Sequence, residues 1–390
     1  MHYFRVEEGL WKTHLEKMKE AGLNAVSTYI PWSLHEPVEG RPDFRGRYAP
    51  NLNLEKFIEL CAEMGLYLTV KPGPYILAEL ALHGIPEWFF QRYPNAAACD
   101  ASGRPYPAEY ACLSHPDYLE KTGRWYDAVL PFLAPYQASC CGPVFLMQVC
   151  NEAGLFQWLG GGGDYSRQSV ADYRAFLKER YQTIEAFEEI HRSQVVNFEA
   201  VFPPAGKAAT RADCLAYRDW HDFHRYFYCA YIQRLIRMIR QRGIDVPLFH
   251  NVPGWVFGRG REMPVCLSMY ADLARRCPDL LLGVDHIPEN VNWRNFHDDR
   301  LINAFATAIQ GRKGPVYIAE LQAGTREDNV VPYPAEMELF YKACLANGAV
   351  GMNYYMFSQG RNPKGWGIYD STFYYQTPLD AEGNAGPSYG

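Results

Sequence analysis

Two stretches of the chain share one pattern of apolar and polar residues. In residues 142–152 and 314–320, a Gly-Pro pair is followed by an apolar run of strand length that ends on polar side chains. Such a run, bounded by turn residues, is typical of a strand buried on both faces of a parallel sheet. Polar residues stand only where each run ends, so we expect Asn151, Glu152 and Glu320 at the exit ends of two buried strands.

The same pattern alternates with helical periodicity along most of the chain. For example, Leu54, Phe57, Ile58 and Cys61 stand at the i, i+3, i+4, i+7 spacing of a helix face. We predict strands over residues 2–6, 24–32, 66–71, 144–150, 246–251, 280–286, 316–320 and 349–357, with helices between them, including 262–276, 296–311 and 334–346. Eight strand-helix units predict an α/β fold, the (β/α)8 barrel, whose active sites lie at the C-terminal ends of the strands.

One long interruption separates the fourth and fifth predicted strands. Residues 164–243 have helical periodicity and predict a helical insertion, which includes a long helix over 219–242. We therefore predict a single catalytic barrel over residues 1–390 with one insertion. A doubly wound open sheet is the alternative, but no Gly-x-Gly-x-x-Gly turn follows the first predicted strand.

Both ends of the barrel look truncated. The first predicted strand has about five residues, and residues 371–390 show no helical periodicity. A short first strand leaves an unpaired sheet edge, which favours pairing with another chain. We therefore expect that the parent sequence begins earlier or that a partner covers this edge, and a homo-oligomer is one such arrangement.

Composition excludes several classes of protein. The chain has 390 residues, 48% hydrophobic and 21% charged, which predicts a soluble globular protein with a large core. A net charge of -6 without a long Lys or Arg run argues against nucleic acid as a partner. The first residues lack the layout of a signal peptide, and no run of about 18 apolar residues exists, so we expect the chain as given to be cytoplasmic and not attached to a membrane.

Metal and redox chemistry are not predicted. The 11 cysteines include no Cys-x-x-Cys pair, and reduced, mostly buried thiols are expected, with the adjacent Cys140 and Cys141 near a turn. His221 and His224 stand three residues apart on a predicted helix, but no third ligand is near in the sequence. We read them as surface or interface residues and predict no cofactor.

Two carboxylates at strand ends fit glycoside hydrolysis, in which one serves as acid/base and the other as nucleophile. The structural alternative is a pair of surface or salt-bridged glutamates. Aromatic residues make up 15% of the chain and suit both core packing and stacking on sugar rings. Trp32, Trp88 and Trp366 are candidates for either role.

Several runs of residues resemble glycoside hydrolase family 35, the β-galactosidases. They are His-Tyr-Phe-Arg at 2–5, residues 15–32 with His-Glu-Pro at 35–37, Lys-Pro-Gly-Pro-Tyr-Ile-Leu-Ala-Glu at 71–79, and Gly-Ile-Pro-Glu-Trp at 84–88. The similarity is dense to residue 154, returns at 353–357 and 378–380, and is closer to the related family 42 over 176–185.

The resemblance implies a retaining exo-β-glycosidase that needs no metal. It implies Glu152 as acid/base after the fourth strand and Glu320 as nucleophile after the seventh, with carboxyl groups roughly 5–5.5 Å apart. Asn151 is implied to bind the hydroxyl next to the anomeric carbon. The resemblance also implies that the sugar pocket is lined by Tyr29, Ile76, Ala78 and Glu79, and that Tyr355 donates a hydrogen bond near the nucleophile.

The chain departs from the family pattern around the expected sugar. Leu77 stands where a cysteine is usual, Leu80 and Ala81 replace a usual Trp-acid pair, and the residues after Glu320 lack the usual aromatics. We predict a β-galactosidase acting on terminal β-linked galactose. The alternatives are another exo-β-glycosidase, for β-glucosaminides or β-arabinopyranosides, and a carbohydrate-binding protein without turnover. His250, Asp285 and His286 end predicted strands and are candidates for substrate contact.

Overall fold

The computed structural model describes most of the chain. The described residues are 1–107, 110–153, 163–252, 267–288, 291–293, 296–311, 315–326, 333–362, 366 and 375–386. The chain forms two compact units. The barrel unit comprises Met1–Trp88, Trp125–Ala153 and Leu235–Gly390, and the helical unit comprises Phe89–Arg124 and Gly154–Arg234.

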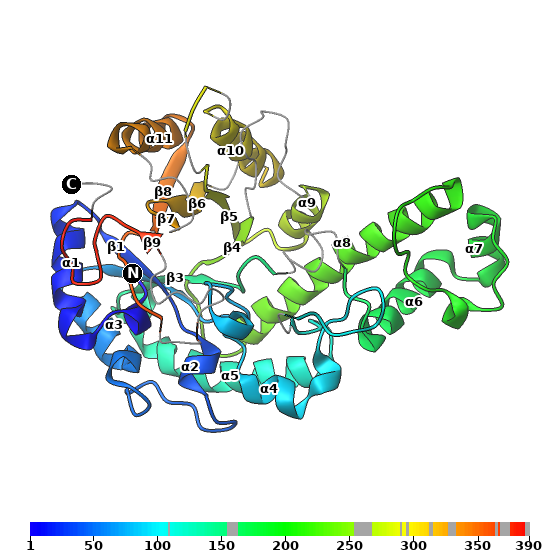
Figure 1. Ribbon diagram of the computed structural model, residues 1–390, viewed down its shortest axis with the longest axis horizontal. Helices are drawn as coiled ribbons and strands as arrows, with labels where there is room; N and C mark the ends of the chain where they lie inside the picture. The colour runs from blue at the N-terminus through cyan, green and yellow to red at the C-terminus, as the bar shows by residue number, and fades with distance from the viewer. Residues whose placement is uncertain are drawn as a thin grey trace. The chain divides into compact units, whose positions relative to one another are not determined.

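A curved parallel sheet forms the centre of the barrel unit (Figure 1). Its seven strands, in spatial order, are β1 (Ala25–Tyr29), β2 (Tyr67–Lys71), β3 (Val144–Gln148), β4 (Leu248–Val252), β5 (Leu280–His286), β6 (Val316–Gln322) and β8 (Ala349–Tyr355). All neighbouring pairs are parallel. Two short strands, β7 (Thr325–Arg326) and β9 (Tyr375–Gln376), pair antiparallel in a separate sheet.

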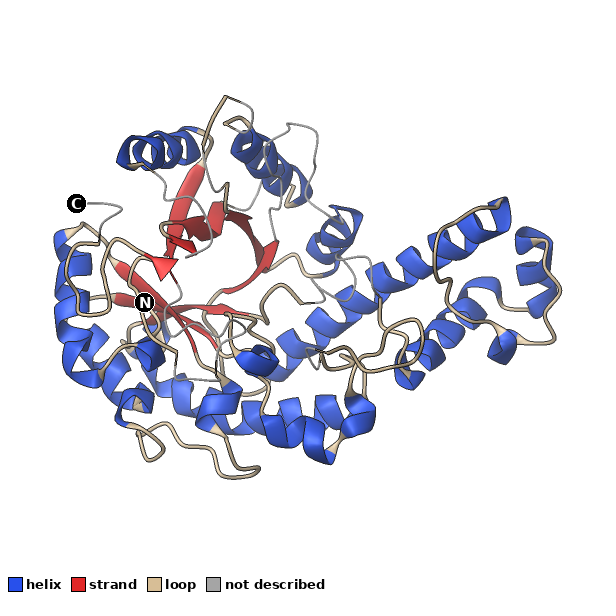
Figure 2. Ribbon diagram, viewed as in Figure 1, coloured by secondary structure: helices blue, strands red, loops and turns tan. Residues whose placement is uncertain are grey.

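Helices lie on the outer side of this sheet (Figure 2). In the barrel unit they are α1 (Trp11–Glu20), the short α2 (Trp32–His35), α3 (Leu54–Glu63), α9 (Leu267–Arg276), α10 (Asp298–Ile309) and α11 (Pro334–Ala346), while α4 (Glu87–Arg92), α5 (Pro116–Leu133) and α8 (Arg211–Arg240) each have residues in both units. Strands inside and helices outside confirm the predicted α/β barrel class.

The helix α3 shows how the sequence specifies these elements. Its apolar face, Leu54, Phe57, Ile58 and Cys61, is completely buried, as its spacing predicts. The side chain of Asn53 caps the helix by accepting a hydrogen bond from the backbone N–H of Lys56 at 3.1 Å. The predicted helix is therefore confirmed.

The predicted first strand is wrong. Tyr3–Arg5 form a 3-10 helix, so within the described residues the sheet has seven strands where we expected eight. Local bonds occupy the backbone groups that a strand would offer to a sheet: Arg5 N–H donates to the His2 carbonyl, and the Trp11 indole donates to the carbonyls of Tyr3 and Val6. Glu152 consequently follows the third strand of the sheet, and Glu320 lies in the sixth.

The first residues still join the two edge strands of the sheet. The ring of His2 stands edge-on to Tyr29 of β1 and to Tyr355 of β8, with centroid distances of 5.2 and 5.7 Å. These contacts place the N-terminal segment between β1 and β8, where an eighth strand would lie in a closed barrel.

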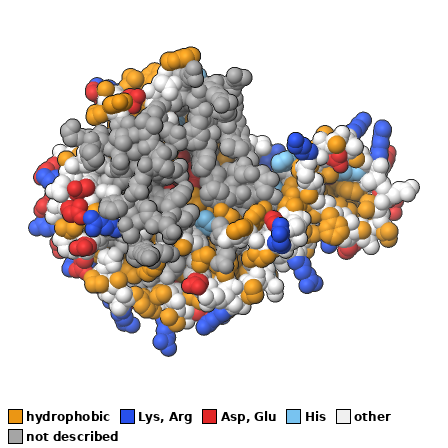
Figure 3. Space-filling model, viewed as in Figure 1, with side chains coloured by type: hydrophobic (Ala, Val, Ile, Leu, Met, Phe, Trp, Pro, Cys, Tyr) orange, Lys and Arg blue, Asp and Glu red, His pale blue; other side chains and the backbone are white. Residues whose placement is uncertain are grey.

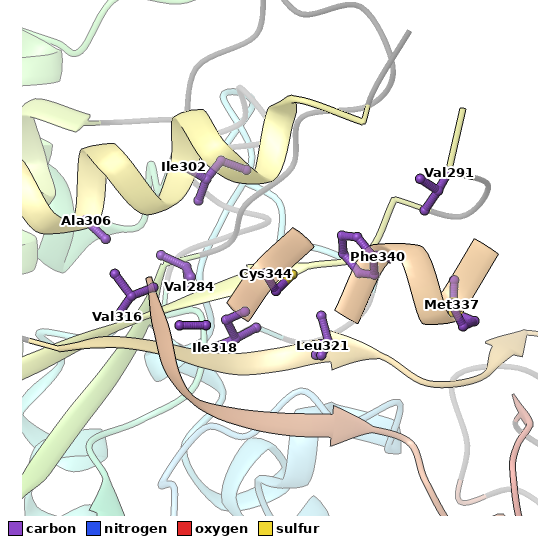
Figure 4. Packing of buried hydrophobic residues seen from close by; sticks show 11 residues of the cluster. Val284, Val291, Ile302, Ala306, Val316, Ile318, Leu321, Met337, Phe340 and Cys344 are labelled. Carbon is purple, nitrogen blue, oxygen red and sulfur yellow. The ribbon is translucent and has the colours of Figure 1, made fainter. Parts of the chain in front are cut away.

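The layer between strands and helices holds a continuous apolar core (Figure 4). Its buried members come from β5, β6, β8, α10, α11 and the segment around Val291: Val284, Val291, Ile302, Ala306, Val316, Ile318, Leu321, Met337, Phe340, Cys344 and Ala349. Burial of this set fixes α10 and α11 against the strands that lead to Asp285 and Glu320.

The helical unit contains α6 (Arg167–Tyr181), α7 (Ile184–His191) and the first part of α8. These helices confirm the predicted helical character of residues 164–243. They enclose an aromatic core that includes Tyr173, Phe187 and Trp220. On the face in Figure 3, apolar side chains of this unit lie among Lys and Arg residues.

The described cysteines are all free thiols, as predicted. Within the described ranges, no helix combines the length and the apolar character that a membrane crossing requires.

We expect Phe340→Ala to destabilise the barrel unit, because Phe340 is 4% exposed and its removal leaves a cavity beneath α11. The expected loss is about 3–5 kcal/mol. Leu339→Ala is the matched control, since Leu339 is the preceding residue of the same helix and is 50% exposed. It should cost about 0.5 kcal/mol or less. Urea denaturation followed by circular dichroism compares the two, and equal losses would contradict the assigned core.

Candidate active site

Glu320 reaches the interior of the barrel through a bulge in β6. Ile318 and Leu321 both pack into the core on the helix side, so the two residues between them, Ala319 and Glu320, both face the interior. The strand pairing shows the same irregularity: Val284 pairs with Ile318, but Asp285 pairs with Glu320. Bulges of this kind re-aim side chains next to active sites, and here the bulge sets Glu320 beside Asp285.

Glu152 lies just after the C-terminal end of β3. Its φ is +40°, and that of Cys150 is +58°, so two residues near the strand end adopt left-handed backbone conformations that cost free energy for L-residues. The backbone N–H of Asn151 donates to the Tyr75 carbonyl at 3.1 Å, and that of Glu152 donates to Asn251 Oδ1 at 3.1 Å. These bonds hold the turn, and Glu152 is buried within it.

Tyr29 contacts both Asn151, which precedes Glu152, and Glu320. Its hydroxyl lies 2.9 Å from Glu320 Oε1 and 2.9 Å from Asn151 Oδ1. A phenol has one proton and donates to one acceptor at a time, and an ionised carboxylate is the stronger acceptor. Tyr29, Asn151 and Glu320 therefore meet at one point of the barrel mouth.

A second set of polar residues continues from Asn151. Gln148 Nε2 donates to Asn151 Oδ1 at 3.0 Å and to Asn251 Oδ1 at 2.9 Å. Asn251 Nδ2 in turn donates to Asp285 Oδ2 at 2.9 Å. Hydrogen bonds thus connect Asn151 through Gln148 and Asn251 to Asp285, and Tyr29 lies between Asn151 and Glu320. No pattern in the sequence singles out Gln148, Asn251 or Lys71.

Lys71 supplies a buried positive charge to this group. Its ammonium lies 4.5 Å from the centroid of the Tyr29 ring. Burial lowers the pKa of Lys71, whereas the carboxylates of Glu320, Asp285, Glu152 and Glu79 act to raise it. Because both Glu152 and Glu320 act on Tyr29, Lys71 and Asp285, the two carboxylates share one electrostatic environment.

The pKa of Glu320 reflects two opposed effects. Burial raises it above the ordinary value for a glutamate, while the Lys71 charge and the hydrogen bond from Tyr29 act to lower it. Lys71 and Tyr29 therefore favour the ionised form of a carboxylate that burial alone would protonate.

The loop over residues 77–79 carries three consecutive left-handed residues, Leu77, Ala78 and Glu79, with φ of 57°, 48° and 52°. Each such residue costs roughly 1–2 kcal/mol, so other contacts must hold the loop. The buried guanidinium of Arg5 donates to the Ala78 carbonyl and to Asn362 Oδ1, the latter at 2.8 Å. Arg5 thereby braces the predicted pocket residues.

The other predicted pocket residues lie in this loop or beside it. Tyr355 donates from its hydroxyl to Glu79 Oε2 at 2.7 Å, which ties the end of β8 to the loop. Ile76 is buried, and its side chain fills the space in front of Gly84, where a Cβ would come within 2.6 Å of it. Ile76 therefore packs inside the loop.

Some candidates face away from the barrel mouth. His250 Nδ1 donates to the Val149 carbonyl at 2.7 Å, and burial lowers the pKa of His250 to about 4. His286 Nε2 bonds Asn303 Oδ1 of α10 at 2.8 Å, so this ring points to the helix layer. Asp285, one residue earlier on the strand, points inward.

The three tryptophans that were candidates for sugar stacking differ in burial. Trp32 and Trp88 are buried and pack against each other with a centroid distance of 5.7 Å, and both indoles donate hydrogen bonds to Glu36. Trp366 is 40% exposed. Trp32 and Trp88 are core residues.

His224, predicted at the surface or an interface, is buried beside Trp220, with a centroid distance of 4.2 Å. Among the described residues, no three His, Cys, Asp or Glu side chains are arranged to hold a metal ion.

A barrel with two buried glutamates near strand ends, one beside a lysine and a tyrosine, has the groups that acid/base and nucleophilic chemistry at a sugar require. The model of the family described as glycosyl hydrolases family 35 matches residues 1–201. The chain belongs to this family.

Several relatives match almost the whole chain. A β-1,2-glucosyltransferase of Ignavibacterium album is 44% identical over 98% of this chain and 54% of its own length. An exo-β-D-glucosaminidase of Pyrococcus horikoshii is 30% identical over 98% of this chain and 49% of its own length. The chain therefore spans about half the length of these relatives.

β-Galactosidases match part of this chain in sequence, and one solved structure matches all of it in fold. The β-galactosidase of Felis catus is 36% identical over 47% of this chain and 23% of its own length. The crystal structure of a β-galactosidase from the psychrophilic Marinomonas ef1 superimposes with a TM-score of 0.77, at 16% identity, over 100% of this chain and 57% of that one. The last similarity shows the fold alone.

We expect Lys71→Met to move the acidic limb of the pH profile of kcat/KM to higher pH. Loss of the Lys71 charge removes an effect that lowers the pKa of Glu320, so a larger fraction of Glu320 is protonated at low pH. The ratio of activity at pH 5 to that at pH 7 should therefore fall. Lys71→Arg keeps the charge and should keep the wild-type limb. An unchanged limb in folded Lys71→Met would contradict the role given to Lys71.

Proposed function

We propose that this chain carries the catalytic barrel of a retaining exo-β-glycosidase that acts by double displacement. The observation that supports it best is the meeting of Glu320, Tyr29 and Asn151 at 2.9 Å contacts, with the Glu152 turn bonded to the same network. A nucleophile, a group for the neighbouring hydroxyl and an acid/base are what this reaction needs.

In the first step the Glu320 carboxylate attacks the anomeric carbon. The bond from that carbon to the leaving oxygen breaks while Glu152 transfers its proton to that oxygen, and a glycosyl ester on Glu320 remains. In the second step Glu152, now ionised, takes the proton of an incoming hydroxyl. The oxygen of that hydroxyl bonds the anomeric carbon and releases the Glu320 carboxylate.

Asn151 is proposed to bind the hydroxyl next to the anomeric carbon, and Tyr29 to hold Glu320 for attack. The loop residues Ala78 and Glu79 are proposed to line the far side of the sugar pocket, with Tyr355 holding Glu79 through its hydroxyl. Ile76 supports that loop from within.

We propose a β-glucoside as the preferred donor substrate, ahead of the β-galactoside that the resemblance suggested. The relatives that match 98% of this chain are named for glucosyl and glucosaminyl groups, whereas the β-galactosidase of Felis catus matches 47%. The departures at Leu77, Leu80 and Ala81 lie beside the proposed pocket and favour the same order.

Transfer to a sugar is the second candidate function. The β-1,2-glucosyltransferase at 44% identity favours it. The chemistry of the two candidates differs only in the second step, in which a sugar hydroxyl replaces water as the acceptor. A single glycosyl ester on Glu320 serves both.

Glu320→Ala should lower the release of nitrophenol from aryl β-glycosides by at least about a thousandfold. Sodium azide should restore turnover and yield the α-glycosyl azide, because azide then attacks from the side where the carboxylate stood. Glu152→Ala with azide should yield the β-glycosyl azide, formed from the glycosyl ester. Glu63→Ala, at an exposed glutamate of α3, is the control and should match wild type. Rescue of neither variant would argue against double displacement.

Added glucose should compete with water for the glycosyl ester. With nitrophenyl β-glucoside as donor, we expect the amount of nitrophenol released to exceed the amount of free glucose formed from the donor, with a β-1,2-linked diglucoside as the product. Labelled donor and chromatography of the products measure this ratio. Equal amounts of nitrophenol and donor-derived glucose at every acceptor concentration would show that water is the acceptor, which would support hydrolysis and contradict transfer.

A further inference from the structure

Asp285 is a third interior carboxyl group that the proposed reaction does not use. It lies near the end of β5, is 2% exposed, and is paired in register with Glu320 of β6. Residues paired across parallel strands point to the same face of a sheet. Asp285 therefore flanks Glu320 on the side of β4 and β5, whereas Tyr29 approaches Glu320 from β1.

One oxygen of Asp285 is held and the other is not. Oδ2 accepts the hydrogen bond from Asn251, while Oδ1 is buried and has no hydrogen-bond partner among the residues that the structure describes. An unsatisfied buried oxygen destabilises the folded state, because it has lost its hydrogen bonds to water. Such a group in a binding site is one that a ligand can satisfy.

The hydrogen bonds around Asp285 lead to the part of the site expected to hold carbon 2 of the sugar. Gln148 bridges the amide oxygens of Asn151 and Asn251, and Asn251 holds Asp285. Asp285 is thus two amide groups away from Asn151, the proposed partner of the hydroxyl on carbon 2. It also adjoins Glu320, the proposed partner of carbon 1.

We propose that Asp285 is a specificity-determining residue whose Oδ1 hydrogen-bonds the hydroxyl on carbon 2 of the donor sugar. This inference rests on the proposed glycosidase function and names its substrate class: β-glycosides with a free 2-hydroxyl. Asn251 holds the other oxygen of Asp285 and so fixes the direction in which Oδ1 points.

Electrostatics distinguishes a 2-hydroxyl from a 2-ammonium group. Burial and the carboxylates of Glu320 and Glu152 raise the pKa of Asp285 well above its ordinary value. A neutral carboxyl group both donates and accepts hydrogen bonds with a hydroxyl, but offers no full negative charge to an ammonium group. Glucosides are therefore expected to be better donors than glucosaminides.

The test compares donors with and without the hydroxyl. In Asp285→Ala, kcat/KM for nitrophenyl β-glucoside should fall about ten- to a hundredfold. For nitrophenyl 2-deoxy-β-glucoside it should change less than about threefold, because no contact is lost. Asp285→Asn, a neutral group of the same shape, should retain most of the activity on the glucoside. Equal losses on both donors would overturn the proposal, since they would indicate a positioning role alone.

Asp299→Ala is the matched control. Asp299 is also buried, at 4% exposed, accepts from Asn347 Nδ2 at 3.1 Å through Oδ2, and has no partner for Oδ1 among the described residues. The Asp299→Ala variant shows how the loss of a buried aspartate away from the barrel mouth affects activity. Its kcat/KM should stay near the wild-type value on both donors. If Asp285→Ala does not fold, Asp285→Ser replaces it. Serine keeps a polar group at this position, but its hydroxyl is too short to reach the sugar.

Ligand binding separates this proposal from the function on which it rests. Calorimetry with 1-deoxynojirimycin, which has the 2-hydroxyl, and isofagomine, which lacks it, needs no turnover. In Asp285→Ala, binding of the first should weaken at least about tenfold and binding of the second should not change. If wild type turns over no aryl glycoside, the proposed function fails while this comparison still decides the role of Asp285. Equal weakening of both ligands would overturn that role.

Discussion

The burial of several carboxyl groups around the ammonium of Lys71 is the constraint on which the rest of the site depends. Burial raises the pKa of Glu320, and burial together with the carboxylates of Glu320 and Glu152 raises the pKa of Asp285. Such a cluster persists only where the surrounding fold holds each group in place. The hydrogen bonds from Tyr29 to Glu320 and from Gln148 to Asn151 and Asn251 provide that restraint, and the β6 bulge sets the position of Glu320. Burial of the apolar layer of Ile318, Leu321 and Phe340 behind the strands stabilises the fold that holds these carboxyl groups together.

Much of this fold follows from patterns in the sequence. Apolar runs after Gly-Pro turns located β3 and β6, and the 3.6-residue period located α3. The intervals between predicted strands located α10 and α11. The first strand was wrong for a physical reason: the indole of Trp11 takes the carbonyls of Tyr3 and Val6, and no local pattern in residues 2–6 reveals that competitor. The resemblance, by contrast, named Tyr29, Asn151 and Glu320 as site residues, and the structure brings these side chains, which stand more than a hundred positions apart, into contact.

The strand-end candidates show where sequence patterns are incomplete. Asp285 points inward and His286 outward because successive residues of a strand face opposite sides. The same alternation separates Asn251 from His250. Applied from a known interior residue, it would have selected Asp285 and Asn251 from the sequence. The alternation rule fails at β6, because the bulge puts Ala319 and Glu320 on one face. The extra residue of the bulge cannot be recognised in an apolar stretch of sequence. Lys71 was missed because a lysine at a strand end is usually solvated.

Arg5 has a consequence for the order in which the site can form during synthesis. Its guanidinium joins the Ala78 carbonyl to Asn362, partners separated from each other by most of the chain. A ribosome makes the residues of the left-handed loop early and Asn362 late, at about 5–20 residues per second. For the interval between them the loop lacks one of the contacts that hold its unfavourable backbone. The barrel can therefore assemble its strands progressively, while the pocket beside Glu79 reaches its final shape only after residue 362 has left the ribosome.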